Sequence, residues 1–180
     1  MTSDWKTIQS NLIFQNPWIE LYEDKVKTRR GTTMNYTWYK SSNVVVIIPF
    51  ITEDALIMIR QYRYPLRKVL LEFPAGHIEE NEDVEKTAKR ELLEETGYFA
   101  NKIQYVYSYH PSVSKSRQIV HVFRAKDLVK GKSEHDRTED IRDIEILSVE
   151  QLKHMIKDRK VESAGTLIAY LICCTGLLDF

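Results

Sequence analysis

Three acidic residues, Glu91, Glu94 and Glu95, lie within five positions near the end of a segment that is predicted to be helical. Residues three and four positions apart share one face of a helix. At about 100° per residue, the three carboxylates occupy a wedge of roughly 100°. Val84 and Ala88 fall in or beside this wedge. The acidic face is therefore expected to point toward the body of the protein.

Carboxylates that are this close repel one another unless a positive charge lies among them. Arg90 can reach Glu94 one helical turn later and offset one charge at most, while position 87, one turn before Glu91, is a threonine. Mg²⁺ and Mn²⁺ prefer carboxylate and carbonyl oxygens as ligands. The cluster therefore favours a site for a hard divalent cation. The alternative is a solvated acidic helix face, which is the commoner origin of an acidic run.

The segments on either side of the acids indicate where the helix begins and ends. Asn81 is the predicted N-cap, and the acids that follow it suit a first helical turn. Gly97 stands where a helix commonly ends in the left-handed conformation. Residues 70–73 are typical of a strand, and Gly76 follows them in a short loop. The unit is predicted to run strand, glycine loop, acidic helix, glycine stop.

The spacing of eight residues carries a resemblance to a known family. The Nudix box reads Gly, five residues, Glu, seven residues, Arg-Glu-aliphatic-x-Glu-Glu-x-Gly-aliphatic, and this chain resembles it at Gly76, Glu82, Arg90, Glu91, Leu92, Glu94, Glu95 and Gly97. Tyr98 stands at the last aliphatic position and is large and mostly apolar. Segments 60–63 and 72–76 resemble the branch of the family that hydrolyses ADP-ribose and nucleotide sugars. With weaker matches toward both ends, the resemblance covers most of the chain.

The order of the predicted elements indicates an α/β protein. Strands are predicted at 44–48, 55–59, 69–73, 103–109, 119–125 and 144–147, and helices at 149–157 and 163–178 follow the acidic helix. Such a mixture favours a sheet covered by helices, and the resemblance implies a Nudix-like α/β/α sandwich around a mixed β-sheet. Residues 1–42 are expected to form an N-terminal antiparallel β subdomain for dimerisation and nucleobase contacts, and residues 43–180 the catalytic domain.

The resemblance implies metal-dependent hydrolysis of the pyrophosphate bond of ADP-ribose or a related nucleoside diphosphate sugar, which yields a nucleoside monophosphate and a sugar phosphate. A bound Mg²⁺ or Mn²⁺ ion lowers the pKa of a water molecule and neutralises phosphoryl oxygens. The family pattern adds two ligands to the helical acids, so the expected set is Glu72, the carbonyl of Ala75, Glu91, Glu94 and Glu95. Arg90 is expected to orient the carboxylates, with Glu82 as its ion-pair partner.

Arginine and tryptophan residues are the first substrate-binding candidates. Arg63 is expected to clamp the diphosphate, because arginine suits bidentate contact with phosphate, and Arg60 lies on the same segment. A solvated strand end is the alternative for both. Trp18 and Trp38 are candidates for stacking on the nucleobase, although packing is the commoner role of aromatic residues in such a region.

One loop after the acidic helix resembles the substrate loop of ADP-ribose hydrolases. Pro111 marks this loop, and Ser112, Ser114 and Lys115 are expected to contact the terminal sugar or phosphate. Relatives often place an acid shortly after a serine here. This chain instead has Arg117 and Gln118, so it departs from the family pattern on the sugar side.

A second loop, residues 130–143, is the expected source of a general base. The box acids are assigned to metal, so an acid from elsewhere is a candidate to deprotonate or position the attacking water. The inner acids of this loop are Glu139, Asp140 and Asp143, and Glu139 is favoured because it lies furthest from the strand at 144–147. Two alternatives stay open: the loop acids are only solvated, or the metal-bound water needs no base.

Composition excludes several classes of partner. The chain of 180 residues has 26 basic and 26 acidic residues, which argues against nucleic acid or an anionic membrane as the main partner. The N-terminus lacks the pattern of a secretory signal, and the apolar segment 167–178 is too short to span a bilayer. Cys173 and Cys174, adjacent in a predicted helix, are expected to be small core residues. A cytoplasmic location is the expectation.

Three other functions are alternatives to this hydrolase. The same chemistry on another nucleotide sugar, such as GDP-mannose, is the nearest alternative. A non-catalytic Nudix domain that binds a nucleotide for regulation is a second one, but such domains usually lose box acids and this chain keeps them all. A purely structural acidic helix is a third. The Trp- and Tyr-rich segment 18–39, with the family resemblance, predicts a homodimer in which the N-terminal strands help to build the partner's nucleotide site.

Overall fold

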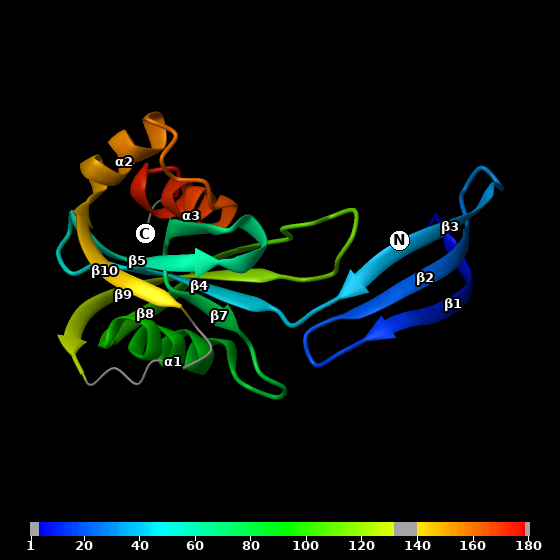
Figure 1. The fold of residues 1–180 in the computed structure, drawn as a ribbon, viewed down its shortest axis with the longest axis horizontal. Coiled ribbons are helices and arrows are strands. Elements are labelled where there is room, and N and C mark those ends of the chain that lie inside the picture. The colour runs from blue at the N-terminus through cyan, green and yellow to red at the C-terminus, as the bar shows by residue number, and fades with distance from the viewer. Residues whose placement is uncertain (1–3, 132–139, 179–180) are drawn as a thin grey trace. The chain divides into compact units, whose positions relative to one another are not determined.

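The computed structural model describes residues 4–131 and 140–178, which form two compact units (Figure 1). The first unit contains the described residues up to Asn43 together with Tyr109–Val120. The second unit contains Val44–Ser108 and the described residues from His121 onward. The loop that follows residue 108 therefore packs with the N-terminal strands.

The first unit is built on a three-stranded antiparallel sheet. Its strands, in the spatial order β1-β2-β3, are β1 (Lys6–Gln15), β2 (Glu20–Lys27) and β3 (Thr33–Lys40). Gly31, in the turn between β2 and β3, has a φ of +85°, in the left-handed region that glycine adopts without steric cost. The sheet confirms the antiparallel strands predicted at the N-terminus.

The second unit contains two sheets. One has the order β10-β5-β6, with β5 (Ala55–Arg63), β6 (Lys68–Glu72) and β10 (Ile141–Ser148). The other has the order β7-β4-β9-β8, with β4 (Val44–Pro49), β7 (Ala75–His77), β8 (Tyr98–Tyr109) and β9 (Val120–Lys130). Residues 45–48 of β4 are all buried, which confirms the strand predicted to be covered on both faces.

Three helices of the described chain complete the second unit: α1 (Val84–Thr96), α2 (Val149–Lys157) and α3 (Ala164–Cys174). Figure 1 shows α2 and α3 on one side of the strands and α1 on the other. Helix α1 contacts β4 and β7, whereas α3 contacts β4 and β6. This layering confirms the predicted α/β/α sandwich.

Helix α1 is fastened to the four-stranded sheet by an apolar cluster, whose buried members are Val45, Ile47, Ala88, Leu92, Phe123 and Ala125. Ala88 and Leu92 are one turn apart on α1, and Val45 and Ile47 are alternate residues of β4, so each pair shares a face. Full burial of a leucine-sized side chain contributes about 1.5–3 kcal/mol. The cluster therefore stabilises the helix that carries the acids.

The N-cap of α1 is Asp83, and the prediction of Asn81 was wrong. The Asp83 carboxylate accepts hydrogen bonds from the backbone N–H groups of Glu85 and Lys86, at 3.1 and 3.0 Å. Asn81 instead has a φ of +65° in the preceding turn, a conformation that asparagine tolerates better than most residues. Asn81 and Asp83 both satisfy the N-cap preference, so residue type alone did not separate them.

The ends of the other helices follow their local sequence. Gly97 has a φ of 71° and its N–H donates to the Leu93 carbonyl, which confirms the predicted end of α1. Helix α3 ends at Cys174 rather than at the predicted 178, because Gly176 turns into the left-handed region at a φ of +71°. Nowhere in the described chain is a helix both long and apolar enough to cross a membrane.

Cys173 and Cys174 are half-buried free thiols near the end of α3. Burial raises the pKa of Cys173 to about 11 and that of Cys174 to about 12. Both side chains are therefore neutral thiols near pH 7, which suits the packing role that was expected of them.

Candidate active site

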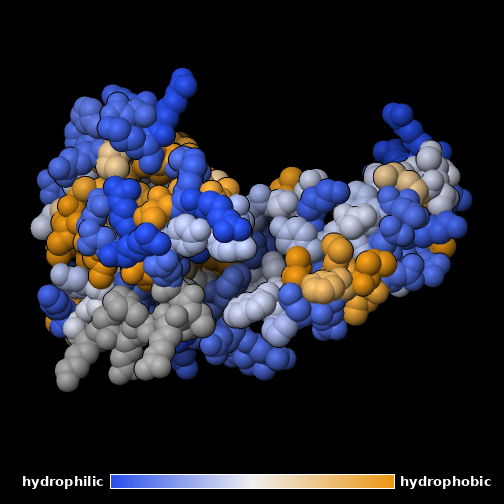
Figure 2. Space-filling model, viewed as in Figure 1, coloured by the Kyte–Doolittle hydropathy of each residue, from blue (hydrophilic) through white to orange (hydrophobic). Residues whose placement is uncertain are grey.

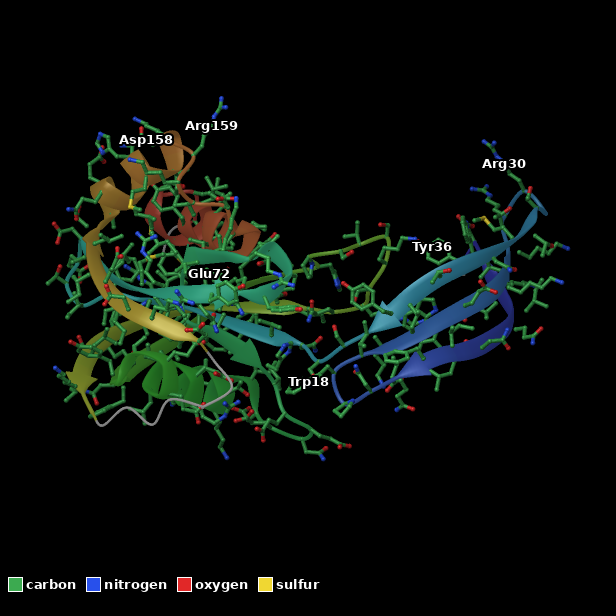
Figure 3. The ribbon with its side chains drawn as sticks, viewed as in Figure 1. Trp18, Arg30, Tyr36, Glu72, Asp158 and Arg159 are labelled. Atoms are coloured by element: carbon green, nitrogen blue, oxygen red, sulfur yellow. The ribbon has the colours of Figure 1, made fainter. Side chains whose placement is uncertain are left out.

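Three buried acids lie in the second unit: Glu72, Glu91 and Glu95, with 7%, 6% and 1% of their surface exposed. Glu72 is the last residue of β6 (Figure 3), whereas Glu91 and Glu95 share a face of α1. The acidic face of α1 thus points into the protein, as predicted. A buried carboxylate is costly unless hydrogen bonds and positive charge compensate it, so the partners of these acids define the site.

Arg90 is the main counter-charge on α1. Its Nη1 donates to Oε1 of Glu91 at 2.7 Å and to Oε2 of Glu94 at 2.9 Å. Its Nε and Nη2 donate to the two carboxylate oxygens of Glu82, both at 2.9 Å. The predicted Arg90–Glu82 pair is confirmed, but Arg90 contacts three carboxylates, more than the single charge that was expected.

The Arg90 network shifts protonation equilibria. Hydrogen bonding to Arg90 is the largest cause that lowers the pKa of Glu82 to about 2, and an N–H bond from Glu79 helps. Glu82, Glu91 and Glu94 in turn raise the pKa of Arg90, with Glu82 contributing most. The guanidinium is therefore held charged and fixed between the loop that precedes α1 and the acidic face of the helix.

Gly76 lets the Glu91 carboxylate lie against the backbone. A Cβ atom placed on Gly76 would come within 2.0 Å of Cδ and 2.1 Å of Oε1 of Glu91. No side chain fits there unless Glu91 moves. The first glycine of the box is thus needed for a close approach between strand β7 and helix α1.

Glu95 ties the end of α1 to the same strand. Its Oε2 accepts a hydrogen bond of 2.8 Å from the backbone N–H of Ala75. Ala75 is also paired with Val46 in the β4–β7 ladder. The backbone of Ala75, whose carbonyl was predicted as a metal ligand, is therefore fixed by both the sheet and the helix.

Glu72 is held by Arg63. Both Nε and Nη2 of Arg63 donate to Oε2 of Glu72, at 2.8 and 2.5 Å. Glu72 lies opposite Ile59 in the β5–β6 ladder, and Arg63 lies four residues further along β5 on the same face. The predicted diphosphate clamp and a predicted metal ligand are thus direct partners in this structure.

Arg60 occupies a different environment. Its Nε donates to Oε1 of Glu145 on β10 at 2.6 Å. Side chains alternate between the faces of a strand, so Arg60 and Arg63, three positions apart, leave β5 on opposite faces. The structure therefore separates two arginines that the sequence had placed together.

The donor atoms fit a hard divalent cation in kind, since all are carboxylate or carbonyl oxygens. The contact of Glu91 with Gly76 also brings a carboxylate to the backbone of β7, the strand that contains Ala75 and that the sequence had predicted as a loop. In the described part of the chain, however, no three acidic, histidine or cysteine side chains converge as a metal cluster. Arg63, Arg90 and the Ala75 N–H hold the acids instead.

The predicted tryptophans lie in the first unit. Trp38 stacks on Tyr22, with ring centroids 4.7 Å apart, and the Arg117 guanidinium lies 4.6 Å from its ring centroid. Its Nε1 donates to the buried carboxylate of Asp24 at 2.9 Å. The indole of Trp38 is thus packed within the unit, whereas Trp18 is 72% exposed (Figure 3).

The predicted substrate loop is fastened to strand β3. The Ser112 carbonyl accepts from the N–H groups of Lys115 and Ser116 in a tight turn, and the Tyr39 N–H donates to the Lys115 carbonyl at 2.8 Å. A pocket of about 200 Å³ lies beside this turn, and Asp24, Tyr36, Trp38, Val113, Ser114, Lys115, Ser116 and Arg117 line it. Asp24 was missed by the sequence analysis, because nothing in its local sequence predicts that it lines this pocket. Pro111 belongs to the same loop.

The predicted general base, Glu139, lies outside the described residues. The two other candidates have local partners. Asp140 pairs with Arg142 at 3.1 Å, and Oδ1 of Asp143 accepts a 2.9 Å hydrogen bond from the N–H of Ile144.

Fold and site together define an α/β/α protein in which the buried acids of helix α1 contact the backbone of strand β7 at Ala75 and Gly76. The chain belongs to the Nudix family, since residues 41–170 match the NUDIX domain. Residues 5–39 match the nucleoside diphosphate sugar hydrolase N-terminal domain. Nudix ADP-ribose pyrophosphatases depend on a divalent metal ion.

Similar proteins share most of the chain. An ADP-ribose pyrophosphatase of Bacillus subtilis (strain 168) is 35% identical over 166 residues, which are 91% of this chain and 89% of that protein. A methanol dehydrogenase activator of Bacillus methanolicus is 33% identical, with 91% and 89% covered. A crystal structure of an ADP compounds hydrolase has the same fold, with a TM-score of 0.85 over 94% of this chain and 92% of that one, at 22% identity.

Proposed function

We propose that the protein hydrolyses the pyrophosphate bond of ADP-ribose or a related nucleoside diphosphate sugar, with Mg²⁺ as the cofactor and Mn²⁺ as a substitute. The observation that carries this proposal is the contact of the buried Glu91 with Gly76, beside the hydrogen bond from Ala75 to the buried Glu95, in a Nudix domain. The match of residues 5–39 to a nucleoside diphosphate sugar hydrolase domain and the Bacillus subtilis relative support the substrate class.

The roles of the site residues follow from their positions. Glu91, Glu94 and Glu95, with Glu72 and the carbonyl of Ala75, would hold the metal. A divalent ion supplies a water of lowered pKa and neutralises charge on the phosphoryl oxygens. Arg90 keeps Glu91 and Glu94 in place through the contacts already described.

Charge on the diphosphate is matched by arginine. Arg63 lies beside Glu72 and offers a planar fork of N–H donors to phosphate oxygens. Arg60, Trp18, Trp38, Pro111 and Ser112 remain proposed substrate contacts. Among them, the packing of Trp38 against Tyr22 and Arg117 favours a supporting role over direct stacking on a base.

A substrate panel tests the proposal. The purified protein with Mg²⁺ is incubated with ADP-ribose, other ADP-sugars and GDP-mannose, and the products are identified by mass. AMP and ribose 5-phosphate are expected from ADP-ribose, with no product after exhaustive chelation and recovery on adding Mg²⁺. A preference for GDP-mannose would favour the alternative nucleotide. Nucleotide binding without any turnover would favour the non-catalytic alternative.

The general base is tested in the loop 130–143. Glu139→Gln is expected to lower kcat steeply, by about 10²-fold or more, with little change in Mg²⁺ affinity, because the residue would act on water and not on the ion. Asp140→Asn and Asp143→Asn are the comparison variants. If all three variants keep kcat within a few-fold of wild type, the metal-bound water needs no base from this loop.

A homodimer and a cytoplasmic location complete the proposal. The dimer would place the N-terminal strands of one protomer at the nucleotide site of its partner. The free thiols of Cys173 and Cys174 support the proposed location. Both remain predictions.

A further inference from the structure

Arg63 and Glu72 form a salt bridge with each other, although each has a proposed role toward a different ligand. Glu72 is a proposed ligand of the metal and Arg63 a proposed contact of the diphosphate. Both N–H donors of Arg63 that bond Glu72 converge on one oxygen, Oε2. Glu72 cannot present this oxygen to a cation while Arg63 covers it, and Arg63 cannot give the same donors to phosphate.

The burial of Glu72 makes its partner necessary. Its side chain is 10% exposed, whereas that of Arg63 is 39% exposed. Removal of one member of a buried pair leaves an uncompensated charge, which is strongly unfavourable. Arg63 can therefore leave Glu72 without a large loss only when another positive charge takes its place. A divalent cation at the carboxylate would do so.

Arg90 and Arg60 are not placed for such an exchange. Arg90 is anchored by Glu82, which is not a proposed metal ligand, as well as by Glu91 and Glu94. Arg60 pairs with Glu145 on the opposite face of β5. Arg63 is the last residue of its strand and its outer part is in solvent, so its guanidinium has room to turn away.

We propose that Arg63 is a positioning residue shared between two partners, in that it neutralises Glu72 in the metal-free protein and is released to the diphosphate when a divalent cation occupies Glu72. The inference rests on the proposed function and adds an order of binding to it. The cation replaces Arg63 at Glu72, and this makes Arg63 available to the diphosphate. Metal and diphosphate then bind with positive coupling, and by linkage each strengthens the other.

The first test measures Mn²⁺ binding to the nucleotide-free protein by calorimetry or by the EPR signal of free Mn²⁺. Arg63→Gln removes the competitor of the cation and is expected to tighten Mn²⁺ binding about 10-fold, the equivalent of one charge-assisted hydrogen-bond pair. Arg63→Lys keeps a charge but loses the fork, and an intermediate affinity is expected. Circular dichroism checks that each variant is folded.

Arg60→Gln is the matched control for Mn²⁺ affinity. It removes one arginine from the same strand and breaks a similar arginine–glutamate pair, but on the other face. A change of less than about 2-fold is expected, because Arg60 pairs with Glu145 on the opposite face of β5 and its loss does not uncover Glu72. Equal tightening in Arg60→Gln and Arg63→Gln would overturn the proposal in favour of a general charge effect.

A double variant locates the exchange at Glu72. In a Glu72→Gln background, Arg63→Gln should tighten Mn²⁺ binding no further, since the paired carboxylate is already absent. Continued tightening in that background overturns the proposal, as does unchanged or weaker Mn²⁺ binding by Arg63→Gln alone.

The proposed contact between Arg63 and the diphosphate is tested by a separate measurement. At saturating Mn²⁺, Arg63→Gln is expected to raise the KM for ADP-ribose about 10-fold or more, because two donors to phosphate are lost. An unchanged KM overturns the proposed contact between Arg63 and the diphosphate. The Mn²⁺ titrations need no turnover, so a protein that hydrolyses no nucleotide sugar would refute the proposed function while the Arg63–Glu72 exchange is still tested.

Discussion

Gly76 is the position at which the backbone of the site meets a buried acid most closely. The φ of Gly76 does not lie in the left-handed region, so alanine is conformationally allowed there, but its Cβ would fall 2.0 Å from Cδ of Glu91. The strict requirement for glycine therefore comes from the carboxylate and not from the backbone conformation.

Gly76→Ala is expected to displace Glu91 and lower kcat/KM by about 10²-fold, the cost of a misplacement of roughly 1 Å near the reacting groups. Mg²⁺ affinity should fall as well, and titration calorimetry with steady-state kinetics measures both. Gly131→Ala is the control, because its Cβ would meet the flexible tip of Leu93 at 3.0 Å, with Phe99 and the Gly97 carbonyl no closer than 3.4 and 3.6 Å. Near wild-type kinetics in Gly76→Ala would show that catalysis does not require the Glu91 carboxylate to lie against Gly76.

Glu94 and Glu95 are the acids whose loss should affect turnover most directly. Glu94→Gln and Glu95→Gln are each expected to lower kcat by about 10²-fold or more, through lost stabilisation of phosphoryl charge. The fold should survive, because a glutamine oxygen at position 95 can still accept the Ala75 N–H. Glu85→Gln, which removes an exposed partner of Lys89 on the outer side of α1, is the control. Unchanged turnover with an unchanged melting profile would contradict the assignment.

Helix α1 is held at both ends by groups outside its apolar face. Asp83 caps its first turn, and Arg90 reaches back to Glu82 in the preceding loop. Gly97 ends it, and Glu95 fastens its last turn to β7. An element that carries mutually repelling acids thus has its ends tied down by polar contacts, while Leu92 and Ala88 bury its inner face.

The Glu82–Arg90 pair predicts a pH dependence of stability. The folded-state pKa of Glu82, about 2, lies below its ordinary value of 4.5. The stabilisation is therefore fully present above about pH 4.5 and is lost as the pH falls through about 2. Urea unfolding between pH 7 and pH 2 should show Glu82→Gln to be less stable than wild type at pH 7. The difference should shrink in acid, and a constant difference would contradict the pairing.

At the scale of the whole molecule, exposed apolar side chains occur on both units, and Figure 2 shows an orange patch on the first unit. Every residue of β1 is exposed, and the large apolar ones there include Ile8, Leu12 and Phe14. Trp18 follows at 72% exposure. Contiguous exposed apolar surface on a protein commonly marks an interaction site. A second copy of the chain is the proposed occupant.

Light scattering is expected to show a dimer at assay concentration. Leu12→Glu and Phe14→Glu should shift it toward monomer, because a charge placed on each apolar contact of a symmetric interface is introduced twice. Activity should fall with the dimer, since the N-terminal strands are proposed to serve the partner's site. Lys27→Glu, an exposed change on β2, is the control. A fully active wild-type monomer would rule the dimer out.

Local spacing was sufficient for much of this protein. The acidic wedge, the glycine stop at residue 97 and the bounds of α2 at 149–157 agree with expectation. Each depends on backbone periodicity and on residues within a few positions of one another, so short-range preference decides them. The N-cap of α1 was misplaced by two residues, since neighbouring residues with similar capping ability compete at that distance.

The partners of the charged residues depended on the folded chain. Arg63 meets Glu72 because the β5–β6 register sets Ile59 opposite Glu72, whereas parity on β5 sends Arg60 to Glu145. The packing of Trp38 against Arg117 joins segments that lie far apart along the chain. Such contacts follow from strand register and from the path of loops between units, which no local pattern encodes. The sequence was therefore enough to identify the acids and the local pairs of Arg90, whereas the fold alone paired Glu72 with Arg63 and Glu145 with Arg60.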